Sequence, residues 1–189
     1  MHKITVNASK RYSIYCGNGL LKNIGKYFLD VCPAKKAVIV TDDTVAPLYA
    51  NIVSKSLEES GIEISLMVIP SGEASKSLEM LEKLYDFCCM HKLTRSDTLV
   101  ALGGGVVGDL TGFAAATYMR GIDFIQLPTT FLAQIDSSVG GKTAVNIPGG
   151  KNLVGSFKQP NLVLCDTDTC EHSRLFILPM AWQKQLNMV

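Results

Sequence analysis

Residues 96–121 read SDTLVALGGGVVGDLTGFAAATYMRG. Thr98–Leu102 has the length and apolar composition of a buried strand, and Val106–Met119 has helical length and contains no proline. Between them, Gly103-x-Gly105-x-x-Gly108 fits the strand–turn–helix fingerprint, in which glycines let backbone N–H groups approach a pyrophosphate. Because this short motif is weak alone, a tight strand-to-helix turn without a ligand is the alternative.

Asp109 stands just inside the expected helix. A carboxylate suits the positive end of a helix, but it repels a phosphate. We therefore expect Asp109 to meet a ribose hydroxyl or another neutral donor.

Apolar strand-like segments alternate with helical segments along the chain. The expected strands are 37–40, 62–70, 98–102 and 124–127, and the expected helices are 20–31, 47–61, 76–91 and 106–119. This order predicts an α/β fold with a Rossmann-like parallel sheet and helices on both faces. A loose alternation over Ile4–Tyr15 adds a β-hairpin that turns near residues 8–10.

Ligands of such sheets lie beyond the carboxyl ends of the strands. The loops at Asp42, Glu73, Gly105 and Thr129 are all ends of this kind. Their agreement is a stronger signal than any single motif.

Residues 136–143, DSSVGGKT, have the look of a phosphate-binding P-loop. Asp136 stands where the first glycine is required and no apolar strand run precedes it, so we exclude a nucleoside triphosphatase. The segment 142–152 predicts a hairpin with two lysines and two asparagines. Lys142 and Lys151 are either solvated surface groups or, together with Asn152, part of a site for a small anionic substrate.

The composition narrows the class of protein. The chain has 189 residues, 47% of them hydrophobic, and a formal net charge of +1. Without a basic run, an apolar segment of spanning length or a signal-peptide core, we expect a cytoplasmic protein that binds neither nucleic acid nor membrane. Six cysteines without a C-x-x-C pair predict mostly buried free thiols, and three scattered histidines offer no metal site.

Several motifs occur together and in order. They are Ser71-Gly72-Glu73-x-x-Lys76, Gly103-Gly104-Gly105-Val106-Val107-Gly108-Asp109, Tyr118-Met119-Arg120-Gly121, Pro128-Thr129-Thr130 and Asp136-Ser137-Ser138-Val139-Gly140-Gly141-Lys142-Thr143. With them the chain closely resembles the 3-dehydroquinate synthases, which belong to the sugar-phosphate cyclases. The match runs from near the start to about Thr169, and the motifs together are highly specific.

The resemblance implies an NAD site and a substrate site. NAD would be held by Asp42, Ser71, Gly72, Glu73, Lys76, Gly105, Val106, Val107, Gly108, Asp109, Thr129, Thr130, Lys142 and Lys151. Substrate would meet Arg120, Asp136, Lys142 and Asn152, with Arg120 reaching the phosphate bound by a neighbouring subunit of a homodimer. The implied reaction converts 3-deoxy-D-arabino-heptulosonate 7-phosphate to 3-dehydroquinate and phosphate in the shikimate pathway. It uses NAD and a divalent metal, zinc or cobalt.

The last residues depart from the family. Its metal ligands, a glutamate and two histidines, lie in a helical C-terminal domain that we expect this chain to lack, so we assign no metal ligand here. The first ligand should fall within an A-E-x-I-K-Y-G segment just after residue 180, where this chain reads MAWQKQLNMV. Codons compatible with 180–189, read with a single-nucleotide offset, can spell DGLAEAIKYG.

We therefore hypothesise a frame slip near Cys170, which divides the chain into an NAD-binding α/β domain, 1–169, and a non-family tail, 170–189. The nucleotide sequence of the gene beyond codon 169 tests the frame-slip hypothesis. Without the second domain we expect no turnover from this chain alone, weakened NAD binding and exposed apolar surface. The alternatives are an NAD-dependent polyol dehydrogenase of the glycerol dehydrogenase type and a non-catalytic nucleotide-binding fragment.

Overall fold

A computed structural model of the chain describes residues 1–173. The strands are β1 (His2–Asn7), β2 (Arg11–Gly17), β3 (Lys36–Asp42), β4 (Glu63–Ile69), β5 (Thr98–Gly103), β6 (Asp123–Pro128), β7 (Lys142–Ile147), β8 (Gly150–Phe157) and β9 (Leu162–Asp166). The α-helices are α1 (Ile24–Val31), α2 (Asn51–Glu58), α3 (Leu78–Met90) and α4 (Gly105–Thr117). The proposed frame slip concerns a tail that lies almost wholly outside these residues and stays a hypothesis.

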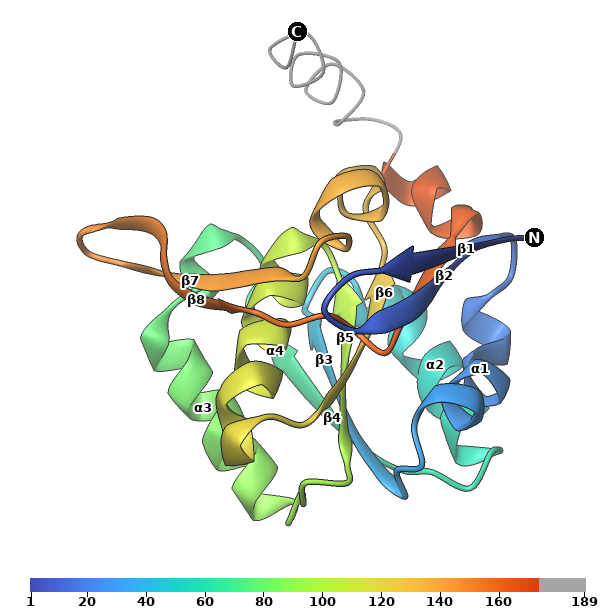
Figure 1. Ribbon diagram of the computed structural model, residues 1–189, viewed down its shortest axis with the longest axis horizontal. Coiled ribbons are helices and arrows are strands. Elements are labelled where there is room, and N and C mark those ends of the chain that lie inside the picture. Colours follow the sequence, from blue (N-terminus) through green and yellow to red (C-terminus); the bar gives the residue numbers. More distant parts are fainter. Residues whose placement is uncertain (174–189) are drawn as a thin grey trace, which may run out of the picture.

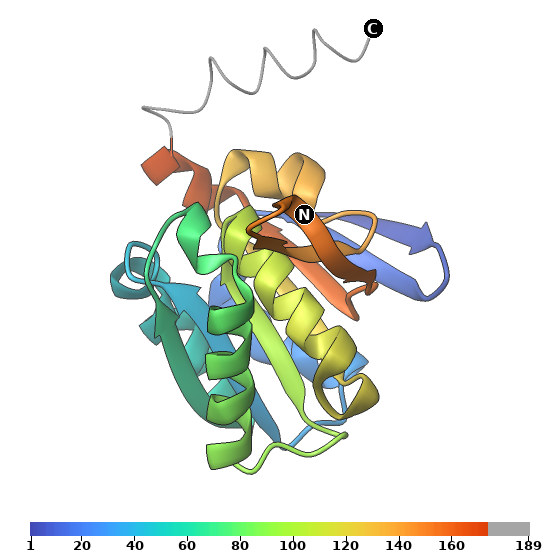
Figure 2. The same ribbon diagram turned by 90° about the vertical axis from the view of Figure 1, so that its left-hand side faces the viewer.

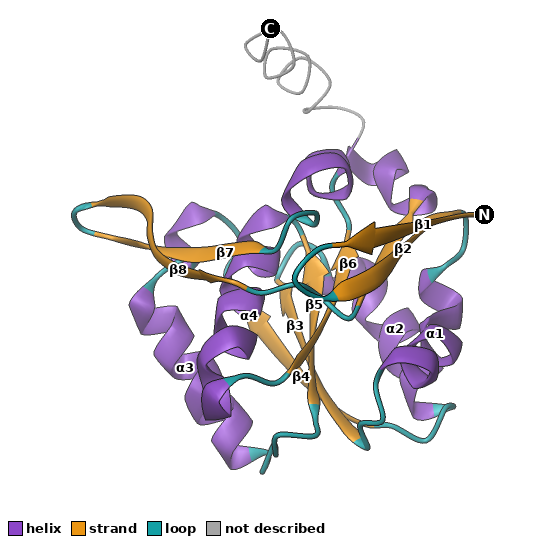
Figure 3. Cartoon of the chain, viewed as in Figure 1, coloured by secondary structure: helices purple, strands orange, loops and turns teal. Residues whose placement is uncertain are grey.

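The described strands form one large sheet and one hairpin. The large sheet has the order β1-β2-β9-β6-β5-β3-β4, and every neighbouring pair in it is parallel except β1 with β2. The separate hairpin pairs β7 with β8 (Figure 3). The expected parallel sheet and both expected hairpins are therefore confirmed.

Helices cover both faces of the sheet, in three layers (Figures 1 and 2). Alternate residues of each central strand face opposite sides: Ile39 packs in the core with α1 and α2, whereas Val38 and Val40 pack in the core with α3 and α4. Because β3, β5 and β6 are buried on both faces, they read as continuous apolar runs.

The sequence prediction missed one strand. We expected no strand at β9, although its five residues are all buried. Moreover, β2 pairs in parallel with β9, with Ile14 beside Val163. The amino-terminal hairpin is therefore an extension of the main sheet and not a separate element.

Helix α4 lies between the sheet and the β7–β8 hairpin, and it has little side-chain bulk. A Cβ atom at Gly112 would overlap the methyl group of Thr143 on β7 and stand 3.0 Å from the buried ring of Phe124 on β6. Glycine therefore lets the helix approach sheet and hairpin together.

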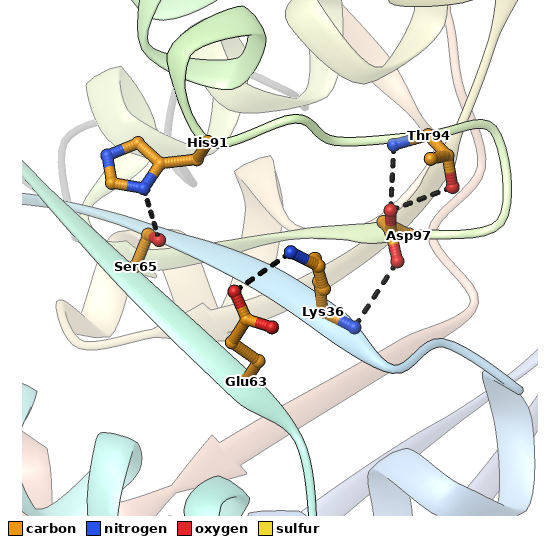
Figure 4. A network of polar contacts seen from close by, with 6 residues as sticks. All are labelled: Lys36, Glu63, Ser65, His91, Thr94 and Asp97. Carbon is orange, nitrogen blue, oxygen red and sulfur yellow. Dashed lines mark hydrogen bonds and ion pairs between the residues drawn. The ribbon is translucent and has the colours of Figure 1, made fainter.

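Polar contacts hold the opposite, amino-terminal ends of the strands (Figure 4). The Asp97 carboxylate accepts hydrogen bonds from the backbone N–H of Thr94 at 2.7 Å and of Lys36 at 3.2 Å. The Lys36 ammonium pairs with Glu63 at 2.9 Å. These contacts set the starts of β3, β4 and β5 side by side, so their carboxyl ends also finish together.

All six cysteines are free thiols, as expected. Burial raises the pKa of Cys32 to about 11 and that of Cys88 to about 12, so both are protonated at neutral pH. Cys89, in contrast, is exposed and departs from the expected pattern. Among residues 1–173, no helix has the length and apolarity that crossing a bilayer requires.

Replacing Gly25 with alanine tests the close packing of α1 on α2. The added Cβ would overlap the main-chain carbonyl oxygen of Ser56 and the hydroxyl of Ser60. We expect Gly25→Ala to lower the free energy of unfolding by about 1–3 kcal/mol, measured by urea denaturation. Gly149→Ala is the control, because its Cβ would make only ordinary contacts of 3.8 Å or more. Equal stability of the two variants would contradict the packing.

Candidate functional site

The loops that leave the sheet at its carboxyl edge contact one another. The Asp43 carboxylate, just after β3, accepts a hydrogen bond of 3.0 Å from the backbone N–H of Ser71, just after β4. The backbone N–H of Thr129, after β6, donates to the carbonyl oxygen of Gly103 at the end of β5, also at 3.0 Å. Four loops that the sequence placed at one edge therefore do lie together.

The start of α4 is open to an anion. Gly104 is its N-cap residue and offers no side chain to the first N–H groups of the helix. A Cβ at Gly104 would stand 3.2 Å from Thr130, and one at Gly105 would stand 3.2 Å from Ser137, so larger residues would fill this cradle. Free N–H groups and the positive end of the helix dipole suit a phosphate.

The other residues of the glycine-rich turn act through backbone. The Val107 side chain is buried in the core, and a Cβ at Gly108 would stand 3.0 Å from the Gln126 side chain. Val106 is half-buried beside them. Val107 can therefore offer a ligand only its main chain, and the Gly108 N–H already donates to the Gly104 carbonyl oxygen at 3.0 Å.

Two threonines follow β6, and one of them has an unused hydroxyl. The Thr130 hydroxyl accepts a hydrogen bond from the Ala133 backbone N–H at 3.2 Å, which begins the short helical turn 133–137. The Thr129 hydroxyl is buried without a hydrogen-bond partner in the described part of the chain. A buried polar group left unpaired is costly, and such groups mark sites that a ligand completes. This group and the Gly104–Gly105 cradle both fit a dinucleotide.

A buried lysine joins three elements at this edge. Lys76 is 5% exposed, and its ammonium donates to the Asp109 carboxylate on α4 and to the Asn152 side-chain oxygen on β8, the latter at 2.5 Å. Our expectation of a neutral donor for Asp109 was therefore wrong in this structure. Burial raises the pKa of Asp109 above its ordinary value, while the Lys76 ammonium works in the opposite direction.

Asn146 fastens the hairpin to the 71–76 loop, a role that the sequence did not reveal. Its side-chain amide donates to the Glu73 carboxylate at 2.8 Å, and its backbone N–H donates to the Lys76 carbonyl oxygen at 2.8 Å. Its side-chain oxygen accepts the backbone N–H of Asn152 at 2.9 Å, where the chain turns with a φ of 57°. Asparagine tolerates this left-handed backbone better than most residues do.

Two cavities lie beside the contacts of Lys76 with Asp109 and Asn152. The first, of about 540 Å³, is lined by α4, the 133–137 turn and the hairpin, and it brings together Asp136, Lys142 and Asn152 beside Asp109. The second, of about 470 Å³, lies on the other side of Lys76 and is lined by Glu73 and Lys151. Three of the four expected substrate residues therefore share one cavity, and the exposed Lys151 stands in the neighbouring one.

Arg120 lies apart from these residues. It follows the far end of α4, which is about 18 Å long at 1.5 Å per residue, and its side chain is exposed. It is not among the residues that line either cavity of its own chain. Asp42 does lie at the carboxyl edge, but one of its oxygens is already used by the backbone N–H groups of Thr44 and Val45.

Apolar side chains stand exposed around the first cavity. Leu153 and Phe157 on β8 are 63% and 77% exposed, and Val139 is 39% exposed. Edge strands of the main sheet also carry exposed apolar side chains, with Ile4 on β1 at 53% and Leu66 and Val68 on β4 at 40% and 47%.

Metal ligands are not grouped in the described residues. Within 1–173, no cluster of three or more histidine, cysteine, aspartate or glutamate side chains could hold a metal ion. The donor set at the described part of the site therefore fits a dinucleotide and an anion but does not by itself fit a metal.

These features define a class: a Rossmann-like α/β unit with an anion-accepting helix start and a polar cavity beside it. Residues 66–174 match the family described as 3-dehydroquinate synthase N-terminal, and the chain belongs to that family. It is 51% identical over 172 residues to the 3-dehydroquinate synthase of Latilactobacillus sakei and 52% identical over 168 residues to that of Enterococcus faecalis. It spans about half the length of these curated relatives, 48% and 47%, while the matches cover 90% and 88% of this chain.

Solved structures agree with the fold. A 2-deoxy-scyllo-inosose synthase, solved with carbaglucose-6-phosphate, NAD+ and Co2+, is 28% identical with a TM-score of 0.84, covering 91% of this chain and 48% of its own. The 2-epi-5-epi-valiolone synthase of Streptomyces hygroscopicus, solved with NAD+ and Zn2+, is 30% identical with a TM-score of 0.76. That match covers 88% of this chain and 46% of the synthase chain. Glycerol dehydrogenase of Schizosaccharomyces pombe, 24% identical with a TM-score of 0.67 over 83% of this chain and 37% of its own, shares the fold alone.

Removing the Lys76 ammonium tests how much the ion pair with Asp109 contributes to stability. In Lys76→Met the Asp109 carboxyl group, 20% exposed, loses its cationic partner and must either stay charged without it or take up a proton, so we expect the free energy of unfolding to fall by about 3 kcal/mol. Lys83→Met is the matched control, because the Lys83–Glu79 pair is exposed and contributes little. Urea denaturation measures both variants. A Lys76→Met protein as stable as Lys83→Met would show that the ion pair does not hold this edge.

Proposed function

We propose that this chain is the NAD-binding half of a 3-dehydroquinate synthase. The activity would be the NAD- and metal-dependent conversion of 3-deoxy-D-arabino-heptulosonate 7-phosphate to 3-dehydroquinate and phosphate, in the shikimate pathway. The observation that carries the proposal is the convergence of Asp136, Lys142 and Asn152 in one cavity beside the start of α4. Membership of the family and the activity named for the relatives support it.

The dinucleotide would lie along the carboxyl edge of the sheet. The backbone N–H groups of Gly105, Val106 and Val107 would face its pyrophosphate, and the buried Thr129 hydroxyl would gain the partner that it lacks. Ser71, Gly72 and Glu73 would line the loop beside it. A bound NAD would supply hydride chemistry: it would take a hydride from the ring carbon that bears a hydroxyl, while that hydroxyl loses a proton, and would later return the hydride.

The substrate would occupy the cavity of about 540 Å³. Lys142 is its exposed cation, and it would bind the phosphate and stabilise the negative charge that develops as phosphate leaves. The Lys76 ammonium holds the Asn152 side chain at the cavity wall, so that asparagine would be oriented before substrate arrives. Asp136, on the 133–137 turn, would accept hydrogen bonds from substrate hydroxyls.

The metal and the second subunit belong to the same proposal. Zinc or cobalt is supported by the two solved cyclases, but the described residues supply no ligand cluster for it, so we derive no step through a metal. Because Lys142 is accompanied by two carboxylates, Asp109 and Asp136, a dianionic phosphate would benefit from a further cation. The exposed Arg120 of a second copy in a homodimer would supply it, and the free thiols suit the reducing cytoplasm.

The polyol dehydrogenase reading has less support, because its likeness is one of fold alone. Glycerol carries no phosphate and has no use for Lys142. A non-catalytic nucleotide-binding fragment would retain the α4 site without turnover. Binding measurements separate these readings.

Filling the cradle at α4 should remove NAD binding. We expect NAD+ titrated into the purified chain in a calorimeter to bind, and Gly105→Val to weaken that binding at least tenfold, about 1.4 kcal/mol. Ala116→Val near the other end of α4 is the control and should bind as the unchanged protein does. No heat of binding in the unchanged chain, or equal affinity of both variants, would reject the assigned site.

The cavity should prefer a phosphorylated substrate. With NAD+ present, we expect 3-deoxy-D-arabino-heptulosonate 7-phosphate to bind and glycerol not to bind. Lys142→Met should weaken substrate binding at least tenfold while NAD+ affinity falls less, and Lys55→Met, an exposed lysine on α2, should change neither. Glycerol binding in place of the phosphorylated sugar would favour the dehydrogenase. Zinc-dependent release of 3-dehydroquinate from this chain alone would contradict our expectation of an inactive half.

A further inference from the structure

Two cysteines lie next to each other on neighbouring strands, outside the site described above. Cys16 on β2 and Cys165 on β9 are direct partners in the parallel register of the main sheet. Neighbouring strands lie about 4.8 Å apart, which falls within the Cα separations that disulfides span. Partners in register project their side chains to the same face, and both thiols belong to one apolar cluster with Tyr12, Ile14 and Val163.

The two thiols differ in accessibility. Cys165 is 3% exposed, whereas Cys16 is half-buried and can meet a small solute. Burial and the neighbouring Cys16 thiol raise the pKa of Cys165 to about 12. Cys16 is the more accessible thiol, so a soluble oxidant reaches it first, and Cys165 is the register neighbour that can react with the product once it gives up its proton.

We propose that Cys16 and Cys165 are an oxidative modification site, which hydrogen peroxide converts to a disulfide across β2 and β9. The Cys16 thiolate attacks one peroxide oxygen, the O–O bond breaks, and Cys16 becomes a sulfenic acid while the leaving hydroxide takes a proton to form water. The Cys165 sulfur then attacks the Cys16 sulfur, forms the S–S bond and releases a second water. The thiol pair loses two electrons, and the peroxide gains them.

The bond would tie the amino-terminal hairpin to the centre of the fold. It would close a loop that runs from residue 16 to residue 165, and long closed loops constrain the unfolded chain most in the entropic account. Its neighbour Asp166 already fixes the turn after β2, accepting backbone hydrogen bonds from Gly19 and Leu21 at 2.9 Å each. Oxidation would therefore reinforce a junction that the reduced protein holds only by hydrogen bonds and packing.

Cys170 is the competing partner. Its thiol lies 3.4 Å from the side-chain oxygen of Gln134, and the Cys165 thiol lies 3.8 Å from the main-chain oxygen of the same residue. Cys170 is not a strand neighbour of either thiol, so the register favours Cys16 with Cys165.

Peptide mapping tests the pairing. The reduced Cys89→Ser protein, which lacks the exposed thiol, is treated with excess hydrogen peroxide, alkylated, and cleaved by trypsin and at aspartate residues. Cleavage before Asp166 separates Cys165 from Cys170. We expect a linked pair of peptides containing Cys16 and Cys165 that lacks the two thiol hydrogens, while Cys32 and Cys88 remain alkylated.

The variants and the stability readout complete the experiment. Cys16→Ser should remove the linked peptides, and Cys165→Ala, which adds no buried hydroxyl, should do the same, whereas Cys32→Ala should keep them. The oxidised protein should unfold at a higher urea concentration than the reduced one, and dithiothreitol should reverse the shift. A cross-link from Cys165 to Cys170, oxidation of Cys16 to sulfinic acid without a cross-link, or an unchanged urea midpoint in the cross-linked protein would overturn the proposal.

Discussion

The ammonium group of Lys76 is the contact on which the carboxyl edge of the sheet depends. It joins the loop after β4, the first turn of α4 and the second strand of the hairpin, through Asp109 and Asn152. A charge this deeply buried is stable only with a partner, so the three elements are bound to one arrangement. The cavity that holds the candidate substrate residues is lined by both partners of this group, Asp109 and Asn152.

The hairpin reaches that edge only because α4 is thin. With Gly112 at its middle, the helix fits between Phe124 of the sheet and Thr143 of β7. Larger side chains there would lift the hairpin and carry Lys142 and Asn152 away from the start of the helix. The same glycine-rich segment therefore has two roles. It leaves the start of the helix open to an anion, and it lets the strands that line the neighbouring cavity approach closely.

Much of the fold and part of the site could be predicted from local pattern. The strands β3, β5 and β6 are apolar runs because both their faces are covered, and the glycines after β5 signal a tight turn into a helix. Strand β9 escaped because only five residues mark it and no helix signal separates it from the hairpin before it. The partner of Asp109 escaped because Lys76 lies 33 positions away and meets it only across packed elements.

The amino-acid sequence by itself determined the class of fold and the residues that stand at strand ends, since periodicity and glycine placement act over a few neighbouring positions. Only the tertiary structure decided that Asp136, Lys142 and Asn152 share a cavity, which Arg120 at the far end of α4 does not line. It also placed Cys16 beside Cys165. Such neighbours depend on strand order and on how the hairpin docks, and both are set by burial and charge pairing between segments far apart in the chain.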